Sequence, residues 1–189
     1  MKQGLSVLVL LGALFASRAD EPAAKDGWSE TVNGLRARLI FGEGTVVSGT
    51  RLPEVYIELH NASDVGNPME FDFSAGKSLR FELRTADGKP APKPSAMTMD
   101  GFVIGPFQIT LPRDGTLKFP VTWHGYGITP NFGTMLCFES AFWEIPRTDQ
   151  TAYFLSAILE VPETPRDPRK AARWHGTLKL PPVKAPTSK

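Results

Sequence analysis

The chain has 189 residues, and its 21 lysines and arginines nearly balance 20 aspartates and glutamates, for a formal net charge of +1. A balance this close to neutral argues against a protein that finds nucleic acid through its overall charge. The single cysteine, Cys137, excludes an intrachain disulfide, and its apolar neighbours Leu136 and Phe138 predict a buried, unreactive thiol. A disulfide to another chain stays open.

The N-terminus has the three parts of a secretory signal peptide. Lys2 gives a positively charged start, and an apolar run follows from Leu5 to Phe15. Ser17 and Ala19 are small residues at the two positions that signal peptidase recognises before the cleavage site. The run is too short for a helix that spans a bilayer, which needs roughly 18 residues or more. We therefore predict cleavage after Ala19 and a secreted or periplasmic protein with no membrane span after cleavage. An uncleaved anchor is the alternative.

The rest of the chain suits a single domain of ordinary size. Residues 20–27 are small, charged and proline-containing, which predicts a flexible leader. The folded domain is expected over residues 28–183, and residues 184–189 are expected to form a disordered tail.

In the first half of the domain, four segments alternate apolar and polar side chains with the period of two that is typical of half-buried strands. These segments are residues 35–41, 55–60, 69–74 and 79–84. Asp87-Gly88 follows the last of them and predicts a turn. Four strands are thus expected within about fifty residues.

The next alternating segments are Phe107–Leu111 and Leu117–Trp123, which flank the turn residues Arg113-Asp114-Gly115. They predict a β-hairpin. Pro120 lacks a backbone donor, so the returning strand is expected at an edge or a bulge. Residues 135–145 are apolar without a clear period, and both a strand and a helical turn stay open there.

The C-terminal part of the domain predicts two strands and a short helical turn. Tyr153–Val161 is apolar on both faces, which is typical of a central strand covered on both sides. Residues 167–173 can begin a helical turn at Asp167-Pro168. Residues 174–180 alternate again and predict a last strand beside Tyr153–Val161, ended by Pro181-Pro182.

Short strands separated by turns, without long helices, predict an all-β fold. We expect an antiparallel, immunoglobulin-like β-sandwich of about 7–9 strands with one or two short helical turns, and a barrel is the alternative. The core is expected to draw on several strands, through Leu59, Phe81, Ile109, Leu155 and Leu178.

Four short segments carry a likeness to known proteins. They are Val32-Asn33-Gly34-Leu35, Val55-x-Ile57-x-Leu59-x-Asn61, Gly125-Tyr126-Gly127 and Trp174-x-Gly176-x-Leu178-x-Leu180-Pro181-Pro182-Val183. In the order of these segments the chain resembles secreted bacterial immunoglobulin-like domains of unknown function. The resemblance implies a fold and a compartment, but no catalytic or ligand-binding residue.

Known chemical motifs are not found in the sequence. His60, His124 and His175 lie far apart and form no zinc spacing, so no metal site and no cofactor are predicted, and surface positions are expected for His60 and His175. Gly-x-Ser-x-Gly is absent, and no serine is predicted at a strand-to-helix elbow. Asn61-Ala62-Ser63 matches a glycosylation acceptor, although a turn is the simpler interpretation.

An aromatic cluster between residues 124 and 143 is the candidate binding region, because aromatic rings can stack on sugars or peptides. The candidate ligand-binding residues are Trp123, His124, Tyr126, Phe132 and Trp143. The favoured interpretation, however, is that the same rings close one end of the core. The cluster becomes a better candidate if several of its rings lie exposed on one face.

The sequence therefore predicts an exported, non-enzymatic binding or structural module with no catalytic residue. The alternative is a carbohydrate- or protein-binding module, one version being a protease inhibitor, that acts through residues 124–143. A small secreted hydrolase is a third hypothesis. The expected partner is an extracellular protein or a glycan, and nucleic acid is not expected.

Overall fold

The computed structural model describes residues 26–64, 68–91, 106–122, 133–139, 142–163 and 173–186. The predicted signal peptide, the first part of the leader and the helical turn expected at residues 167–173 lie outside this range, except for Arg173 itself. The described residues form twelve strands and one helix of four residues. In chain order these are β1 (Leu35–Phe41), β2 (Thr45–Val47), β3 (Thr50–Leu52), β4 (Val55–Asn61), β5 (Met69–Phe73), α1 (Ala75–Ser78), β6 (Leu79–Thr85), β7 (Phe107–Leu111), β8 (Thr116–Pro120), β9 (Thr134–Cys137), β10 (Phe142–Ile145), β11 (Tyr153–Val161) and β12 (Gly176–Lys184).

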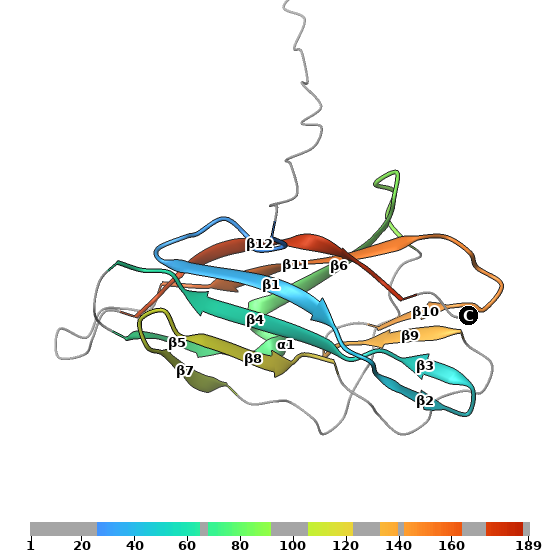
Figure 1. Cartoon of the computed structure of the whole chain (residues 1–189), viewed down its shortest axis with the longest axis horizontal. Coiled ribbons are helices and arrows are strands. Elements are labelled where there is room, and N and C mark those ends of the chain that lie inside the picture. The colour runs from blue at the N-terminus through green and yellow to red at the C-terminus, as the bar shows by residue number, and fades with distance from the viewer. Residues whose placement is uncertain are drawn as a thin grey trace, which may run out of the picture.

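The strands form four sheets (Figure 1). Most of their buried apolar side chains form one main core, and Leu52, Met135 and Cys137 form a second, small cluster in the β10-β9-β3-β2 sheet. Their strand orders are β1-β4-β8, β12-β11-β6, β5-β7 and β10-β9-β3-β2. All the strand pairs are antiparallel except β3 and β9, which run parallel where Arg51 faces Thr134. The all-β prediction is confirmed. Twelve strands exceed the expected number because residues 45–52 and 134–145 contribute four short ones.

The alternation in the sequence appears in the structure as one buried face on each strand. In β4, Val55, Ile57 and Leu59 are fully buried, and the residues between them are half-buried. Of the core residues expected from the sequence, all but one are at most 2% exposed: Leu59, Ile109, Leu155 and Leu178. Phe81 is the exception, because it is only partly buried and stacks on Phe138 with their ring centroids 3.8 Å apart.

The hairpin predicted from residues 107–123 is wrong. β7 pairs with β5, and β8 pairs with β4, so the two strands belong to different sheets. The turn between them does form, because the N–H of Gly115 donates to the carbonyl of Pro112 over 2.9 Å. The turn therefore moves the chain from one sheet to another. β8 is an edge strand of its sheet, as Pro120 predicted.

β11 is the central strand of its sheet, as predicted, with β6 on one side and β12 on the other. Only one of its faces is fully buried, however. Residues 154, 156 and 158 are half-buried, so the expected cover on both faces is not found.

β12 is longer than the sequence predicted, since Pro181 and Pro182 do not end it. The register with β11 shifts between Leu155 and Ala157, opposite these prolines. A bulge tolerates prolines because some of its residues leave the hydrogen-bonded ladder. The first residue of the expected disordered tail, Lys184, therefore belongs to β12. The next residue, Ala185, is buried, and its N–H donates to the carbonyl of Tyr153.

The undecided segment, residues 135–145, contains two antiparallel strands, β9 and β10. Every residue of β9 is buried, which removes the alternation that would have marked it as a strand.

Candidate functional site

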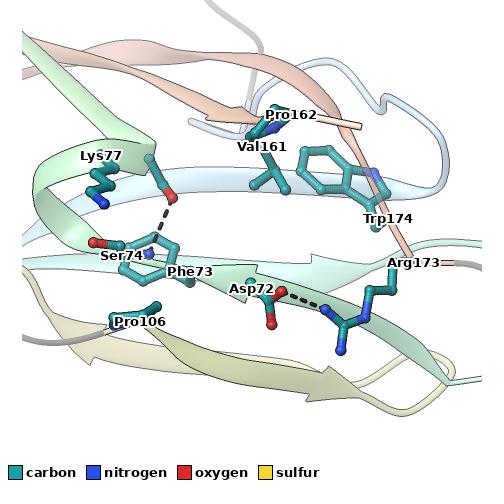
Figure 2. Close-up of a pocket in the computed structure, with 10 residues that line it drawn as sticks. Asp72, Phe73, Ser74, Lys77, Pro106, Val161, Pro162, Arg173 and Trp174 are labelled. Atoms are coloured by element: carbon teal, nitrogen blue, oxygen red, sulfur yellow. Dashed lines mark hydrogen bonds and ion pairs between the residues drawn. The ribbon is translucent and has the colours of Figure 1, made fainter. Parts of the chain in front are cut away.

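A pocket of about 180 Å³ lies where β5, α1, the end of β11 and residues 173–174 meet (Figure 2). Its wall is mostly apolar and is formed by Phe73, Pro106, Val161, Pro162 and Trp174. Its polar lining residues are Asp72, Ser74, Lys77, Ser78 and Arg173. The pocket thus combines an apolar interior with a few polar groups, the composition typical of binding sites.

Arg173 and Trp174 hold one side of the pocket. Arg173 forms an ion pair with Asp72, and the backbone N–H of Trp174 donates to the carbonyl of Glu70 over 2.7 Å. The indole Nε1 of Trp174 donates to the carbonyl of Val32 over 2.9 Å. Trp174 is therefore fixed by two hydrogen bonds before any ligand arrives, which lowers the entropic cost of binding.

The opposite side comes from the junction of β5 and α1. Ser74 lies between the strand and the helix, where its N–H donates to the hydroxyl of Ser78 over 3.1 Å. The helix ends after one turn because Leu79 returns to an extended backbone and begins β6. Ser74 and Ser78 are buried, whereas Lys77 is exposed at the rim.

Ser74 corrects the expectation that no serine stands at a strand-to-helix elbow. Ser74 and Lys77 have the spacing Ser-x-x-Lys, which occurs in serine acyl-transferring enzymes with a lysine partner. In this site, however, no hydrogen bond joins the two side chains among the described contacts. The N–H of Ser74 is also engaged with Ser78, so it is not free to stabilise an oxyanion.

The size of the pocket limits what it can hold. An apolar cavity of roughly 150 Å³ accepts one benzene molecule, whereas sites for drug-sized ligands measure roughly 300–1,000 Å³. A pocket of about 180 Å³ therefore fits one aromatic or branched aliphatic group. That is the size of a single anchor side chain from a protein partner.

Of the five candidate ligand-binding residues in the aromatic cluster, for which a core position was the favoured interpretation, the structure describes only Trp143. Trp143 is 6% exposed and packs in the core with its ring edge-on to Phe138, at a centroid distance of 6.0 Å. The other four candidates, Trp123, His124, Tyr126 and Phe132, lie outside the described residues. Trp143 thus stabilises the core and does not offer a surface for stacking.

The two described histidines and the cysteine singled out in the sequence do not line the pocket. His175 is exposed, and His60 is half-buried beside Trp28 with their ring centroids 5.8 Å apart. Cys137 is free and buried, and burial together with the negative charge of Glu144 raises the pKa of its thiol to about 11. Little thiolate therefore exists near neutral pH, in agreement with an unreactive thiol.

Asn61 is fully buried, which argues against its glycosylation. Its side-chain amide donates to the carbonyls of Leu111 and Pro112, both over 3.1 Å. Its carbonyl oxygen accepts hydrogen bonds from the N–H and the hydroxyl of Ser63, over 3.1 and 2.6 Å. The turn interpretation of Asn61-Ala62-Ser63 agrees with these contacts.

The pocket could not be predicted from the sequence, because the residues that line it come from two parts of the chain about a hundred residues apart. One local signal existed: Ser74-Ala75-Gly76-Lys77 directly follows the alternating residues of β5. Nothing in the sequence indicates that Val161 and Trp174 would face this junction. The two parts are brought together by the backbone pairing of residues 173–174 with Glu70 and by the ion pair between Arg173 and Asp72.

Within the described ranges, no group of three or more His, Cys, Asp or Glu side chains is placed to hold a metal ion. No helix in the same part of the chain is long and apolar enough to cross a membrane. Comparison of the chain with models of protein families, with curated proteins and with solved structures found no match in any of the three. The pocket geometry therefore carries the functional argument.

Proposed function

We propose that this chain is an exported binding module without catalytic activity, built on an immunoglobulin-like β-sandwich, that holds one apolar side chain of a protein partner. The observation that carries the proposal is the pocket of about 180 Å³ beside Trp174. Export rests on the predicted signal peptide, and the sandwich rests on the two three-stranded sheets that share one core.

The surroundings of the pocket favour a protein partner. Anchor side chains of protein interfaces fill small preformed pockets that are surrounded by polar residues. Lys77 and the Asp72–Arg173 ion pair provide such polar groups around the apolar wall (Figure 2). A carboxylate or carbonyl of the partner could reach Lys77 while its anchor fills the pocket.

Capped amino acids test this proposal, because each presents one side chain without a charged backbone. We expect the amides of N-acetyl-phenylalanine and N-acetyl-leucine to shift the NMR signal of the Trp174 indole N–H in a saturable manner. N-acetyl-alanine amide should cause no such shift, because a methyl group leaves most of the pocket empty.

Two exposed prolines that directly follow a strand provide matched variants. Pro162→Phe places a ring at the pocket and should weaken binding of the capped phenylalanine, whereas Pro146→Phe lies after β10 and should leave binding unchanged. Equal titration curves for both variants, or no saturable shift in the wild type, would contradict the proposal.

The hydrolase hypothesis has one feature in its favour, the Ser74-x-x-Lys77 spacing in the pocket. A fluorophosphonate probe separates it from binding, since such a probe labels only an activated serine. We expect no labelling and no turnover of nitrophenyl esters. Labelling that Ser74→Ala abolishes would replace the binding module with a serine hydrolase.

A further inference from the structure

The solvent-facing side of the β1-β4-β8 sheet is a second feature with its own chemistry. Registers place Arg38, Glu58 and Lys118 in one row across the three strands, which lie side by side in Figure 1. Arg36 lies on the same face one step along β1, since the residues between these positions point into the core. We call Trp28, Arg36, Arg38, Tyr56 and Lys118 the basic face.

Aromatic rings hold the cations of the basic face. The guanidinium carbons of Arg36 and Arg38 lie 4.9 and 4.4 Å from the centre of the Trp28 ring. The ammonium of Lys118 lies 4.5 Å from the centre of the Tyr56 ring. These are the three cation–π contacts among the described residues, and all lie on this one face. Such contacts restrict the cations to fewer orientations.

The charges of the basic face are not balanced. Glu58 is engaged with Arg38 over 2.6 Å, and Glu54 is engaged with the hydroxyl of Tyr56. Arg36 and Lys118 have no carboxylate partner among the described residues. Both side chains can therefore form charge-assisted hydrogen bonds with an anionic group that reaches this face.

From these contacts we propose that the basic face binds an acidic polysaccharide, with Arg36 and Lys118 contacting its carboxylate or sulfate groups. The central row of this face contains Glu58 and Lys118, and both residue types are depleted at protein interfaces. An extended polyanion contacts several cations in succession, and this face presents Arg36 on β1 and Lys118 on β8. The proposal concerns a surface separate from the pocket.

Polygalacturonate and a heparin fragment are the probes, because they separate carboxylate from sulfate recognition. We expect saturable binding of at least one of them by calorimetry, weakened by added salt. Arg36→Ala/Lys118→Ala should weaken it about tenfold, which is about 1.4 kcal/mol. The matched control, Arg80→Ala/Lys179→Ala, removes the same charge from the exposed positions of β6 and β12 and should leave binding unchanged.

The Trp28→Ala variant tests whether binding requires cations held in fixed orientations or only the positive charge of the face. The variant keeps every charge but removes the ring that orients Arg36 and Arg38, so we expect several-fold weaker binding by a protein that still unfolds in a cooperative thermal transition. Equal losses in the two double variants, wild-type binding by Trp28→Ala, or equal affinity for a single-stranded DNA oligonucleotide would overturn the proposal. Failure of both polysaccharides to bind would also overturn it, and would leave the pocket tests unaffected.

Discussion

Two pairs of consecutive strands behave in opposite ways. β7 and β8 are separated by only four residues that form a tight turn, yet they pair with different neighbours. β11 and β12 are separated by fourteen residues and pair along most of their length. A turn signal therefore predicts that the chain reverses direction, but not that the flanking strands pair with each other.

Asn61 explains why β7 and β8 separate. Its side chain binds the carbonyls of Leu111 and Pro112, and its backbone N–H donates to the carbonyl of Gly115 over 3.0 Å. The end of β4 therefore holds both ends of the turn. β8 then continues beside β4, while β7 lies beside β5.

The largest effect should come from removing β12. A stop after Arg173 deletes Trp174, Leu178 and Leu180, each at most 5% exposed, and burial of such side chains contributes about 1.5–3 kcal/mol apiece. Most of a domain's stability of about 5–15 kcal/mol would be lost, so we expect no cooperative thermal transition by circular dichroism. A stop after Pro186 should melt like the full chain. A cooperative transition of the shorter form at the full-length temperature would show that β12 is dispensable.

An intermediate effect is expected at Asn61, the residue that separates β7 from β8. Asn61→Ala removes all four hydrogen bonds of the buried side chain, two of them to the carbonyls of Leu111 and Pro112, so it should cost about 2–4 kcal/mol in urea denaturation. Gln108→Ala is the control, because it removes an exposed amide that donates to Glu70 over 2.9 Å. It should cost less than about 0.5 kcal/mol. Similar small costs for both variants would mean that Asn61 does not hold the turn.

The smallest effect concerns the start of β11, where the hydroxyl of Tyr153 donates to Asp149 over 2.8 Å. Burial and the Asp149 carboxylate raise the pKa of Tyr153. The folded state therefore keeps the phenol proton to higher pH than the unfolded chain. This contribution is complete below the unfolded pKa of about 10 and is lost as pH rises through the folded value.

Tyr153→Phe removes this titration and keeps the ring. We expect its melting temperature to fall less than that of the wild type between about pH 7 and pH 10.5. Asp149→Asn should also reduce the alkaline loss, because it removes the carboxylate that raises the tyrosine pKa. Parallel curves for the wild type and Tyr153→Phe would show that the start of β11 does not respond to this pair.

The sequence predicted individual strands well, because alternation is a local property of the backbone. In β1, β4 and β5 the buried residues are the apolar ones of the pattern, with Asn61 at the end of β4 as the one buried polar exception. β9 was not predicted, because all four of its residues are buried and show no alternation. The prediction that Pro181-Pro182 ends the last strand was wrong, because a bulge accommodates these prolines.

The amino-acid sequence by itself determined the all-β class, the faces of most strands and the central place of β11. Only the tertiary structure decided which strands pair, and therefore where the pocket lies. Phe73 and Trp174 meet because residues 173–174 pair with β5 before entering β12. Partner choice depends on contacts between residues far apart in the chain, and no local pattern contains those contacts.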